Sequence, residues 1–483
     1  MQIFIVQRVL GILLKLFSFT QLVPLAVSLW YNDGQSIAFV TAFTVTFLIG
    51  LAFWFPVRQT RQDLRLRDGF IIVVMFWVVL SAFGAIPLML STHPHMQAVD
   101  AVFETVSGLT TTGATVITGL DHLPFSILYY RQQLQWLGGM GIIVLAVAVL
   151  PMLGIGGMQL YRAETPGPMK DNKLTPRITE TAKALWYIYL GLTVSCAALY
   201  WVAGMTPFDA IAHSFSTIAI GGFSTHDASM GYFNSPLIQV IAIVFMLLAG
   251  INFSLHFIAW RSLSLMPYLR DAEVKAYLLL LATTAFITTA LLYRFNTFDT
   301  TGAALLAGIF QAVSIGTTTG FTTEAYYLWP SAIPVILLFA AFVGGCAGST
   351  AGGIKVIRFL LLIKQGGREI KLLIHPNALI PIKVGGKPLS SRVMDAVWGF
   401  FAAYVASFIV IMLILMVSGL DQVTAFSAVA ATINNLGPGM GEVGANYASL
   451  GTFQKWVLCF SMLLGRLEVF TLLVLLSAAF WRK

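Results

Sequence analysis

Four short glycine-containing stretches recur along the chain and constrain its architecture more than any other feature. Each follows a short semi-polar segment and lies between two long apolar segments. The stretches are 110–114, 219–223, 317–321 and 434–438, with key glycines Gly113, Gly222, Gly320 and Gly437, which are 109, 98 and 117 residues apart. Such internal repetition predicts one structural unit built four times.

Composition identifies the solvent in which these units fold. Hydrophobic residues make up 58% of the chain and charged residues only 10%, which indicates an integral membrane protein in a lipid bilayer. The formal net charge is +8, but the positive charges fall in short loops between apolar runs. This pattern disfavours nucleic-acid binding, which needs a basic surface stripe.

The apolar runs predict an all-α integral membrane fold with ten transmembrane helices, because a span needs about 20 residues. The first two spans form a separate unit, 1–67, and the remaining spans form pore repeats 68–160, 161–270, 271–375 and 376–483. Each repeat has the order span, re-entrant half-helix, glycine loop, span (M1-P-M2), and the half-helices are expected at 98–109, 208–218, 303–316 and 423–433. Since each unit crosses twice, the repeats are parallel and related by pseudo-fourfold symmetry around one pore.

Lysine and arginine counts predict the orientation. With both termini cytoplasmic, the outer side keeps only Arg131, Arg294 and Lys455, which fits the positive-inside rule. The inner side then collects Arg58, Arg61, Arg65, Arg67, Arg162, Lys170, Lys173, Arg177, Lys183, Arg261, Arg270, Lys275, Lys364, Arg368, Lys371, Lys383, Lys387, Arg392, Arg482 and Lys483.

The glycine loops are suited to ion coordination by the main chain. Rings of backbone carbonyls can replace the water shell of a cation without a buried net charge, and glycine permits the backbone angles that this needs. The apolar Ile220 and Leu436 are poor side-chain ligands, and no Asp or Glu ring is present, which favours a monovalent cation. The carbonyls expected to bind the ion belong to Thr111, Thr112, Ile220, Gly221, Thr318, Thr319, Asn435 and Leu436.

The segment 344–353 interrupts an apolar run halfway. Its ten residues contain five glycines, so this span should break into two helices joined by a loop. A kink without further function is the alternative interpretation. A nucleotide-binding loop is disfavoured, because the segment lacks the Gly-Lys-Ser/Thr ending.

These loops, the fourfold repeat and the broken segment resemble the TrkH/KtrB superfamily of potassium uptake proteins, most closely its bacterial TrkH branch, over essentially the whole chain. The resemblance implies potassium uptake across the bacterial inner membrane by a homodimer. It also implies a cytosolic TrkA-type regulatory ring that binds the nucleotide, so that no covalent cofactor is expected on this chain. The basic inner loops 162–183 and 364–392 are the candidates for contact with that ring.

The resemblance further implies that segment 344–353 is an intramembrane gate. The residues concerned are Gly344, Gly345, Gly348, Ser349, Thr350, Gly352 and Gly353. It also implies that Arg466, in the middle of the last span, projects into the pore below the filter as a barrier to cations. Intramembrane charges usually face a cavity or a partner. The alternative for Arg466 is a structural ion pair, for which Glu468 is poorly spaced on a helix.

Other polar residues suggest structural roles. Asp100, Asp209 and Asp421 precede three half-helices and are interpreted as N-caps, with attraction of cations at the outer mouth as the alternative. Glu104, His213 and Gln311 each stand nine residues before their glycine, which suggests packing behind the filter. Glycines in the following spans, at Gly138, Gly250, Gly344 and Gly465, fit either close helix packing or a hinge.

The predicted function is a gated potassium pore driven by the membrane potential. A potassium symporter coupled to H⁺ or Na⁺ is the alternative, although it needs a titratable or second-ion site for which only Arg466, Glu468 and Glu104 are candidates. A sensor or scaffold would leave the four loops without a purpose. No spacing indicates an enzyme or a zinc site.

Overall fold

A computed structural model describes residues 2–59, 65–141 and 178–482, and in this part of the chain the regular structure consists of helices and one short hairpin. The first helices are α1 (Ile3–Thr20), α2 (Leu22–Tyr31) and α3 (Ser36–Trp54). The chain reverses between α2 and α3 at Asn32, which has a φ of 50°. Gly11 and Gly50 allow α1 and α3 to pack closely, because a Cβ at Gly11 would lie 2.7 Å from the backbone nitrogen of Trp54.

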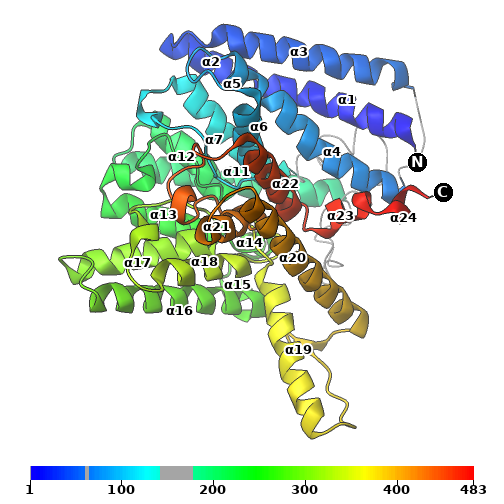
Figure 1. Cartoon of the computed structure of the whole chain (residues 1–483), viewed down its shortest axis with the longest axis vertical. Helices are drawn as coiled ribbons and strands as arrows, with labels where there is room; N and C mark the ends of the chain where they lie inside the picture. The colour runs from blue at the N-terminus through cyan, green and yellow to red at the C-terminus, as the bar shows by residue number, and fades with distance from the viewer. Residues whose placement is uncertain (1, 60–64, 142–177, 483) are drawn as a thin grey trace.

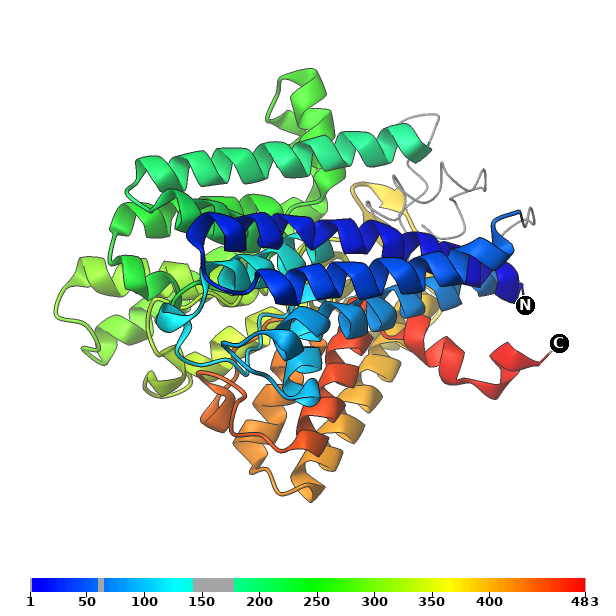
Figure 2. The ribbon, with the colours of Figure 1, turned by 90° about the horizontal axis from the view of Figure 1, so that it is seen from above.

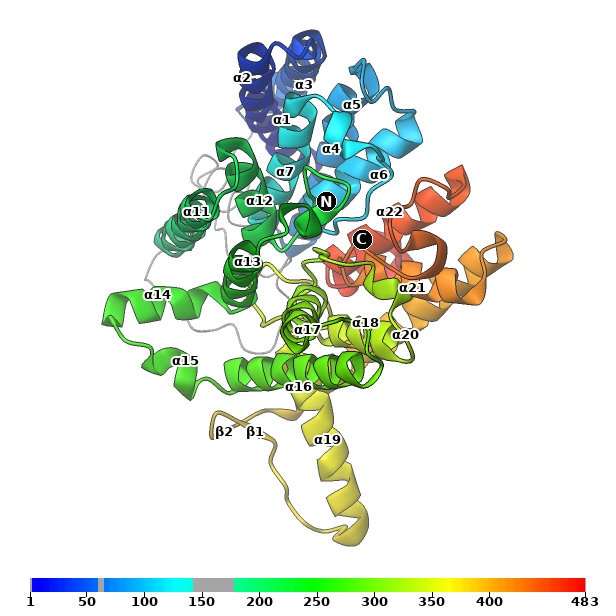
Figure 3. The ribbon, with the colours of Figure 1, turned by 90° about the vertical axis from the view of Figure 1, so that its left-hand side faces the viewer.

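The remaining helices form groups around a common centre, which Figure 3 shows in end view. The first group is α4 (Leu66–Gly84), α5 (Ile86–Leu90), α6 (Ala98–Leu109) and α7 (Phe125–Gly139). The second is α11 (Ile178–Val202), α12 (Pro207–Ala219), α13 (Pro236–Ala249), α14 (Phe253–Ser262) and α15 (Met266–Arg270). The third is α16 (Ala272–Arg294), α17 (Thr301–Gly316), α18 (Ile333–Val343) and α19 (Val356–Ile374). The last is α20 (Ser391–Val417), α21 (Gln422–Ile433), α22 (Thr452–Arg466), α23 (Phe470–Leu476) and α24 (Ala478–Trp481).

Short 3₁₀ turns and the hairpin complete the structure. The turns are η1 (Phe55–Val57), η2 (Leu120–His122), η4 (Ser229–Phe233), η5 (Tyr326–Leu328) and η6 (Gly441–Val443). Strands β1 (Lys383–Val384) and β2 (Lys387–Pro388) pair antiparallel after α19, which projects away from the other helices in Figures 1 and 3.

Several helices are long and apolar enough to cross a membrane. In the described residues there are six, with two further candidates if each bent helix pair is one span. One pair is α13 and α14, bent by 97°, and the other is α22 and α23, bent by 117°. The predicted break at 344–353 is confirmed, since α18 ends at Val343 and α19 begins at Val356.

The buried apolar core joins elements that are distant in sequence. Its largest cluster connects α1, α4, α6 and α7 with α18, α20, α21 and α22, and a second cluster lies between α11, α12, α13 and α17. Both termini lie on the same side of the molecule (Figures 1 and 2), where Arg67 Nη1 donates to the Arg482 carbonyl at 3.0 Å. Six predicted inner-side cations lie outside the described residues, together with most of loop 162–183: Arg61, Arg162, Lys170, Lys173, Arg177 and Lys483.

Candidate functional site

Four short helices lead the chain toward the centre of the molecule. Helices α6, α12, α17 and α21 have 12, 13, 16 and 12 residues, about 18 to 24 Å at ~1.5 Å per residue. They are too short to cross a hydrocarbon core of about 30 Å. Their bounds agree with the predicted half-helices to within two residues, and each ends at one of the glycine loops.

The four loops share one backbone conformation despite different side chains. The residue two before each glycine has a left-handed backbone, and so does the glycine itself. The φ angles of the former are 56° at Thr111, 54° at Ile220, 67° at Thr318 and 53° at Asn435, and those of the glycines range from 78° to 97°. A left-handed β-branched residue is strained and persists only where the surroundings impose it. Three of the four residues are β-branched and therefore strained, whereas asparagine tolerates this region; the common conformation thus does not follow from the side chains, and the fold imposes it on all four loops.

The loops close into a ring, because each glycine packs against the carbonyl that precedes the glycine of the next loop. A Cβ added to any of these glycines would lie within 2.6 Å of that carbonyl oxygen, so none has space for a side chain. The contacts run from Gly113 to Gly221, from Gly222 to Thr319, from Gly320 to Leu436 and from Gly437 to Thr112, which returns to the first loop.

Side chains of the ring are occupied with one another. The Oγ1 atoms of Thr110 and Thr112 are 2.7 Å apart, and those of Thr317 and Thr319 are also 2.7 Å apart. Asn435 Nδ2 donates to Thr112 Oγ1 at 2.9 Å. These bonds tie the threonines to each other and to the asparagine, and backbone carbonyls therefore remain the groups suited to an ion.

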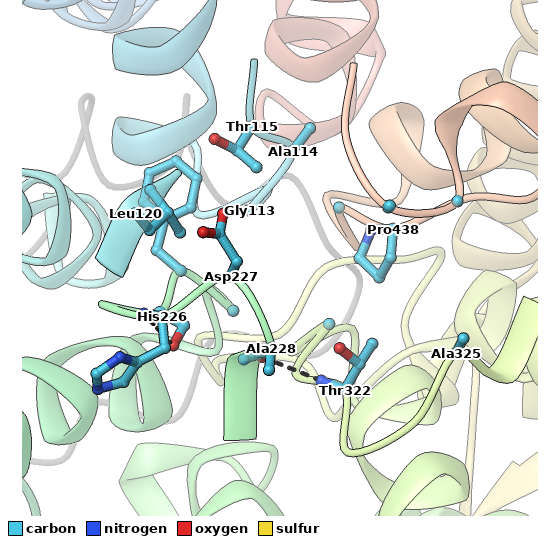
Figure 4. Close-up of a pocket in the computed structure, with 18 of the residues that line it drawn as sticks. Gly113, Ala114, Thr115, Leu120, His226, Asp227, Ala228, Thr322, Ala325 and Pro438 are labelled. Atoms are coloured by element: carbon cyan, nitrogen blue, oxygen red, sulfur yellow. Dashed lines mark hydrogen bonds between the residues drawn. The ribbon is translucent and has the colours of Figure 1, made fainter. Parts of the chain in front are cut away.

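A cavity of about 340 Å³ lies over the ring, and all four key glycines line it. Figure 4 shows labelled residues from the four loop segments around it. Asp227 and Glu324 contribute carboxylates to its wall, which is favourable for cations. Hydrogen bonds join neighbouring segments: Gly119 N to Asp227 Oδ1 at 3.0 Å, Gly231 N to Thr322 O at 3.2 Å, Tyr326 Oη to Pro438 O at 3.2 Å and Tyr447 N to Thr115 O at 2.8 Å.

His226 joins two segments at the rim of this cavity. Its Nδ1 lies 2.6 Å from Asp121 Oδ1 and its Nε2 lies 3.5 Å from Asp209 Oδ1, while its ring stacks on Tyr232. Burial by itself would lower the pKa of His226, but the hydrogen bonds and charges of Asp209 and Asp121 outweigh it and raise that pKa above its usual value.

The loop between α18 and α19 lies directly against the ring and contacts several of its segments. Gly352 N donates to Thr318 Oγ1 at 2.7 Å, and Gly353 N donates to the Asn434 carbonyl at 3.1 Å. Thr350 Oγ1 donates to the Ile218 carbonyl at 2.9 Å. Gly352 has no space for a side chain, since its Cβ would lie 1.9 Å from the Asn434 oxygen.

The same loop is anchored on its other side. Gly344, Gly348 and Gly353 have left-handed φ angles of 69°, 75° and 76°. Glu273 Oε1 accepts from Ala347 N of the loop at 2.7 Å and from Ile357 N in the first turn of α19 at 3.2 Å. Sequence reasoning missed this anchor, because Glu273 lies more than 70 residues away.

Arg466 connects the ring with the loop beneath it. Its Nη1 lies 3.2 Å from Thr111 Oγ1 and 3.4 Å from the Thr350 carbonyl, and its Nη2 donates to the Gly138 carbonyl at 2.7 Å. Glu468 forms a 2.5 Å ion pair with Arg358 of α19. Arg466 thus bonds to both the ring and the loop, and its role as a barrier to cations stays a prediction.

The N-cap interpretation is correct for one aspartate and wrong for two. Asp421 caps α21 by accepting from Val423 N and Thr424 N. Asp209 lies inside the first turn of α12, which Thr206 caps. Asp100 lies inside α6 and pairs with Lys455 at 2.7 Å. Both helices begin earlier than the aspartates suggested.

The span glycines allow close packing. A Cβ at Gly138 would lie 1.8 Å from the Leu109 carbonyl oxygen, and one at Gly465 would lie 2.1 Å from that of Ile433. In both cases the partner is the last turn of the short helix in the same segment. Cys196, Cys346 and Cys459 are free and buried, and the described residues contain no cluster of three or more His, Cys, Asp or Glu side chains able to hold a metal.

Comparison with known proteins agrees with this geometry. Residues 35–483 match the family described as "TrkH: Cation transport protein". The chain is 57% identical over 478 residues to the Trk system potassium uptake protein TrkH of Vibrio parahaemolyticus, and 54% identical over 478 residues to TrkH of Escherichia coli K12. It is 44% identical over 479 residues to TrkG of the same strain, and each alignment covers 99% of both chains. A crystal structure of the potassium transporter TrkH from Vibrio parahaemolyticus matches with a TM-score of 0.91 at 54% identity, covering 100% of both chains.

Proposed function

Because the chain belongs to the TrkH family of cation transport proteins, we propose that it is the gated, potassium-selective pore of a potassium uptake system in the bacterial inner membrane. The names of three relatives, each a Trk system potassium uptake protein, support potassium as the transported ion. The membrane potential supplies the driving force, worth about 2.3 kcal/mol per charge for each 100 mV.

The observation that carries this proposal is the closed ring of glycine and carbonyl contacts. Four loops with one left-handed backbone conformation present main-chain oxygens around a common centre, the arrangement by which a desolvated monovalent cation is bound. The proposed ligands are the carbonyls of Thr111, Thr112, Ile220, Gly221, Thr318, Thr319, Asn435 and Leu436. Gly113, Gly222, Gly320 and Gly437 hold the loops close enough for these oxygens to act together.

The proposed architecture has ten spans and four parallel M1-P-M2 units with pseudo-fourfold symmetry. Unit 1–67 precedes the pore, and the pore units are 68–160, 161–270, 271–375 and 376–483. The helices α7 and α18, added to the six long helices and the two bent pairs, support this number of spans. The short helices α6, α12, α17 and α21 act as the re-entrant half-helices, whose negative ends favour a cation at the ring.

The proposed gate is the loop 344–353 together with Arg466. Its contacts with Ile218, Thr318 and Asn434 support a closed position against the inner face of the ring. The guanidinium of Arg466 adds a positive charge beside this passage. The gating residues are Gly344, Gly345, Gly348, Ser349, Thr350, Gly352, Gly353 and Arg466.

A homodimer with cytoplasmic termini and a cytosolic TrkA-type ring completes the proposal. The Trk system names of the relatives support an assembly of this type. The nucleotide would bind to the ring, and this chain would carry only the transported ion. The basic segment 364–392, which includes the projecting end of α19, is a candidate contact for the ring.

The test is ⁸⁶Rb⁺ uptake into liposomes that contain the full chain, with electrical potential and pH gradient imposed separately. We expect uptake to follow the potential, to ignore the pH gradient and to rise in Arg466→Ala. Uptake that requires a pH or Na⁺ gradient would show that the protein is a coupled symporter and not a pore. Absence of cation flux in the wild type under every gradient would refute both.

A further inference from the structure

A buried ion pair lies behind the ring, outside the groups proposed to bind the ion. Glu104 of α6 and Arg131 of α7 have side chains that are 0% and 1% exposed, with Arg131 Nε 2.8 Å from Glu104 Oε1. Two charges withdrawn from water are costly unless further hydrogen bonds satisfy them. Their bonding partners therefore indicate what the pair does.

Every bond that Glu104 makes besides the pair goes to the segment directly after Gly113. Thr115 Oγ1 donates to both carboxylate oxygens at 2.9 and 3.1 Å, and Val116 N donates to Oε2 at 3.0 Å. The carboxylate thus holds the first loop where it leaves the ring.

Arg131 reaches the corresponding segment of the second loop. Its Nη1 donates to the Ser224 carbonyl at 3.0 Å, and its guanidinium carbon lies 4.3 Å from the centre of the Phe223 ring, directly after Gly222. Its Nη2 donates to Thr115 Oγ1 at 3.1 Å. A planar guanidinium with fixed donor directions can hold these groups at set positions, and it therefore ties the first loop to the second.

The equivalent positions in the other units do not repeat this arrangement. His213, nine residues before Gly222, makes a neutral version of the Glu104 contact, with Nε2 2.9 Å from Ser224 Oγ. Gln311 occupies the same position before Gly320, yet in the described structure neither of its side-chain polar atoms has a hydrogen-bond partner. The fourth unit has Ala428 there. The charged connection is thus particular to the first two loops.

We propose that Glu104 and Arg131 are positioning residues that fix the separation of the first and second loops and thereby set the preference of the pore for K⁺ over Na⁺. This inference rests on the proposed function. The K⁺/Na⁺ preference of a carbonyl site depends on its size and on how many oxygens coordinate the ion together, and both depend on the separation of the loops that carry these oxygens. Neither residue touches the ion, and both act through Thr115, Val116 and Ser224.

The experiment compares K⁺ with Na⁺ permeability, from reversal potentials of the full chain in planar bilayers. The variants are Glu104→Gln, Arg131→Lys, Arg131→Met and the double variant Glu104→Gln/Arg131→Met, which leaves no unpaired buried charge. Gln311→Leu is the control, at the same position of a unit without the connection. A second readout is the shift of the thermal unfolding midpoint by KCl relative to NaCl in detergent, which needs no flux.

We expect the K⁺/Na⁺ permeability ratio to fall at least tenfold in each variant at positions 104 and 131. This includes Arg131→Lys, which keeps the positive charge but lacks the planar guanidinium with its several donors. Gln311→Leu should keep the wild-type ratio. The stabilisation by KCl over NaCl should decrease in the same variants.

If the single variants fail to fold and the double variant folds with the wild-type ratio, the pair is only structural and the inference is wrong. A wild-type ratio in Arg131→Lys or Glu104→Gln would overturn it equally. A wild type without cation flux and without preferential stabilisation by KCl would instead overturn the proposed function on which it rests.

Discussion

Substitution of Gly113 by alanine tests the ring most directly. The added Cβ would lie 2.1 Å from the Gly221 carbonyl oxygen, where ordinary contact begins at 3.4 Å, so the two loops must separate by about 1.3 Å or the oxygen must turn away. The φ of 81° at Gly113 adds left-handed strain, worth about 1–2 kcal/mol for an L-residue.

Gly119 supplies a matched control in the same loop segment. Its φ is 73°, but nothing lies within 4 Å of its Cβ position. Gly119→Ala therefore carries the same backbone strain without the clash, and the difference between the two variants isolates the contact with the second loop.

The assay is ⁸⁶Rb⁺ uptake into liposomes under an imposed potential, with equal amounts of folded protein verified by size-exclusion chromatography. We expect Gly113→Ala to reduce uptake by at least tenfold. Displacement of one carbonyl ligand should weaken ion binding at the ring by more than ~1.4 kcal/mol, which corresponds to a tenfold change in the binding constant. Gly119→Ala should retain at least about half of the wild-type uptake, because nothing there obstructs the ring. Equal uptake by both alanine variants would refute the reasoning that the glycine contacts hold the loops in register.

Three further predictions follow from single contacts. Thr318→Val removes the hydroxyl that accepts from Gly352 N and keeps the backbone of the loop. The closed position of the gate should lose about 1 kcal/mol of net stabilisation, so ⁸⁶Rb⁺ uptake should rise about fivefold. Unchanged uptake would mean that this bond does not hold the gate closed. Asp421→Ala should lower the free energy of unfolding by about 1 kcal/mol, with Asp421→Asn close to wild type, as measured by thermal unfolding in detergent. The pKa of His226 is raised in the folded protein, so protonated His226 contributes to folding stability fully below the usual pKa of about 6.5, and this contribution is lost as the pH rises through the folded-state pKa. His226→Gln should therefore destabilise the protein more at pH 6 than at pH 8.5 in the same thermal unfolding assay. An equal effect at both pH values would contradict the raised pKa of His226.

The local part of the fold could be predicted from the sequence because hydropathy and glycine are local signals. The segment 98–109 coincides with α6, and the five glycines of 344–353 mark the break between α18 and α19. Both depend on the membrane solvent, which makes a short semi-polar segment unable to cross and a glycine cluster unable to remain helical.

The contacts between units could not be predicted, because they join residues that are distant in sequence. By its position in the sequence Arg131 is one of three predicted outer cations, yet it is buried and bonded to Ser224, 93 residues away. The partner of Glu468 is Arg358, 110 residues away, although Arg466 is nearer in sequence. The spacing of Glu104, His213 and Gln311 before their glycines was the one signal available, and it indicated packing without identifying the arginine.

The contacts of the proposed gate are weak enough to be reversed by a partner. Three hydrogen bonds join the loop to the ring or its flanking helix end, from Thr350, Gly352 and Gly353, and Arg466 adds one to the Thr350 carbonyl. At about 0.5–1.5 kcal/mol net for each, they hold the closed position by roughly 2–6 kcal/mol. A ligand must favour one state by about 5.5 kcal/mol to move an equilibrium from 1:99 to 99:1. Helix α19 begins at the end of this loop, so a cytosolic regulatory partner bound to α19 would need to supply no more than this free energy to open the gate. The four glycine loops are held by their own contacts and could keep their shape in both states.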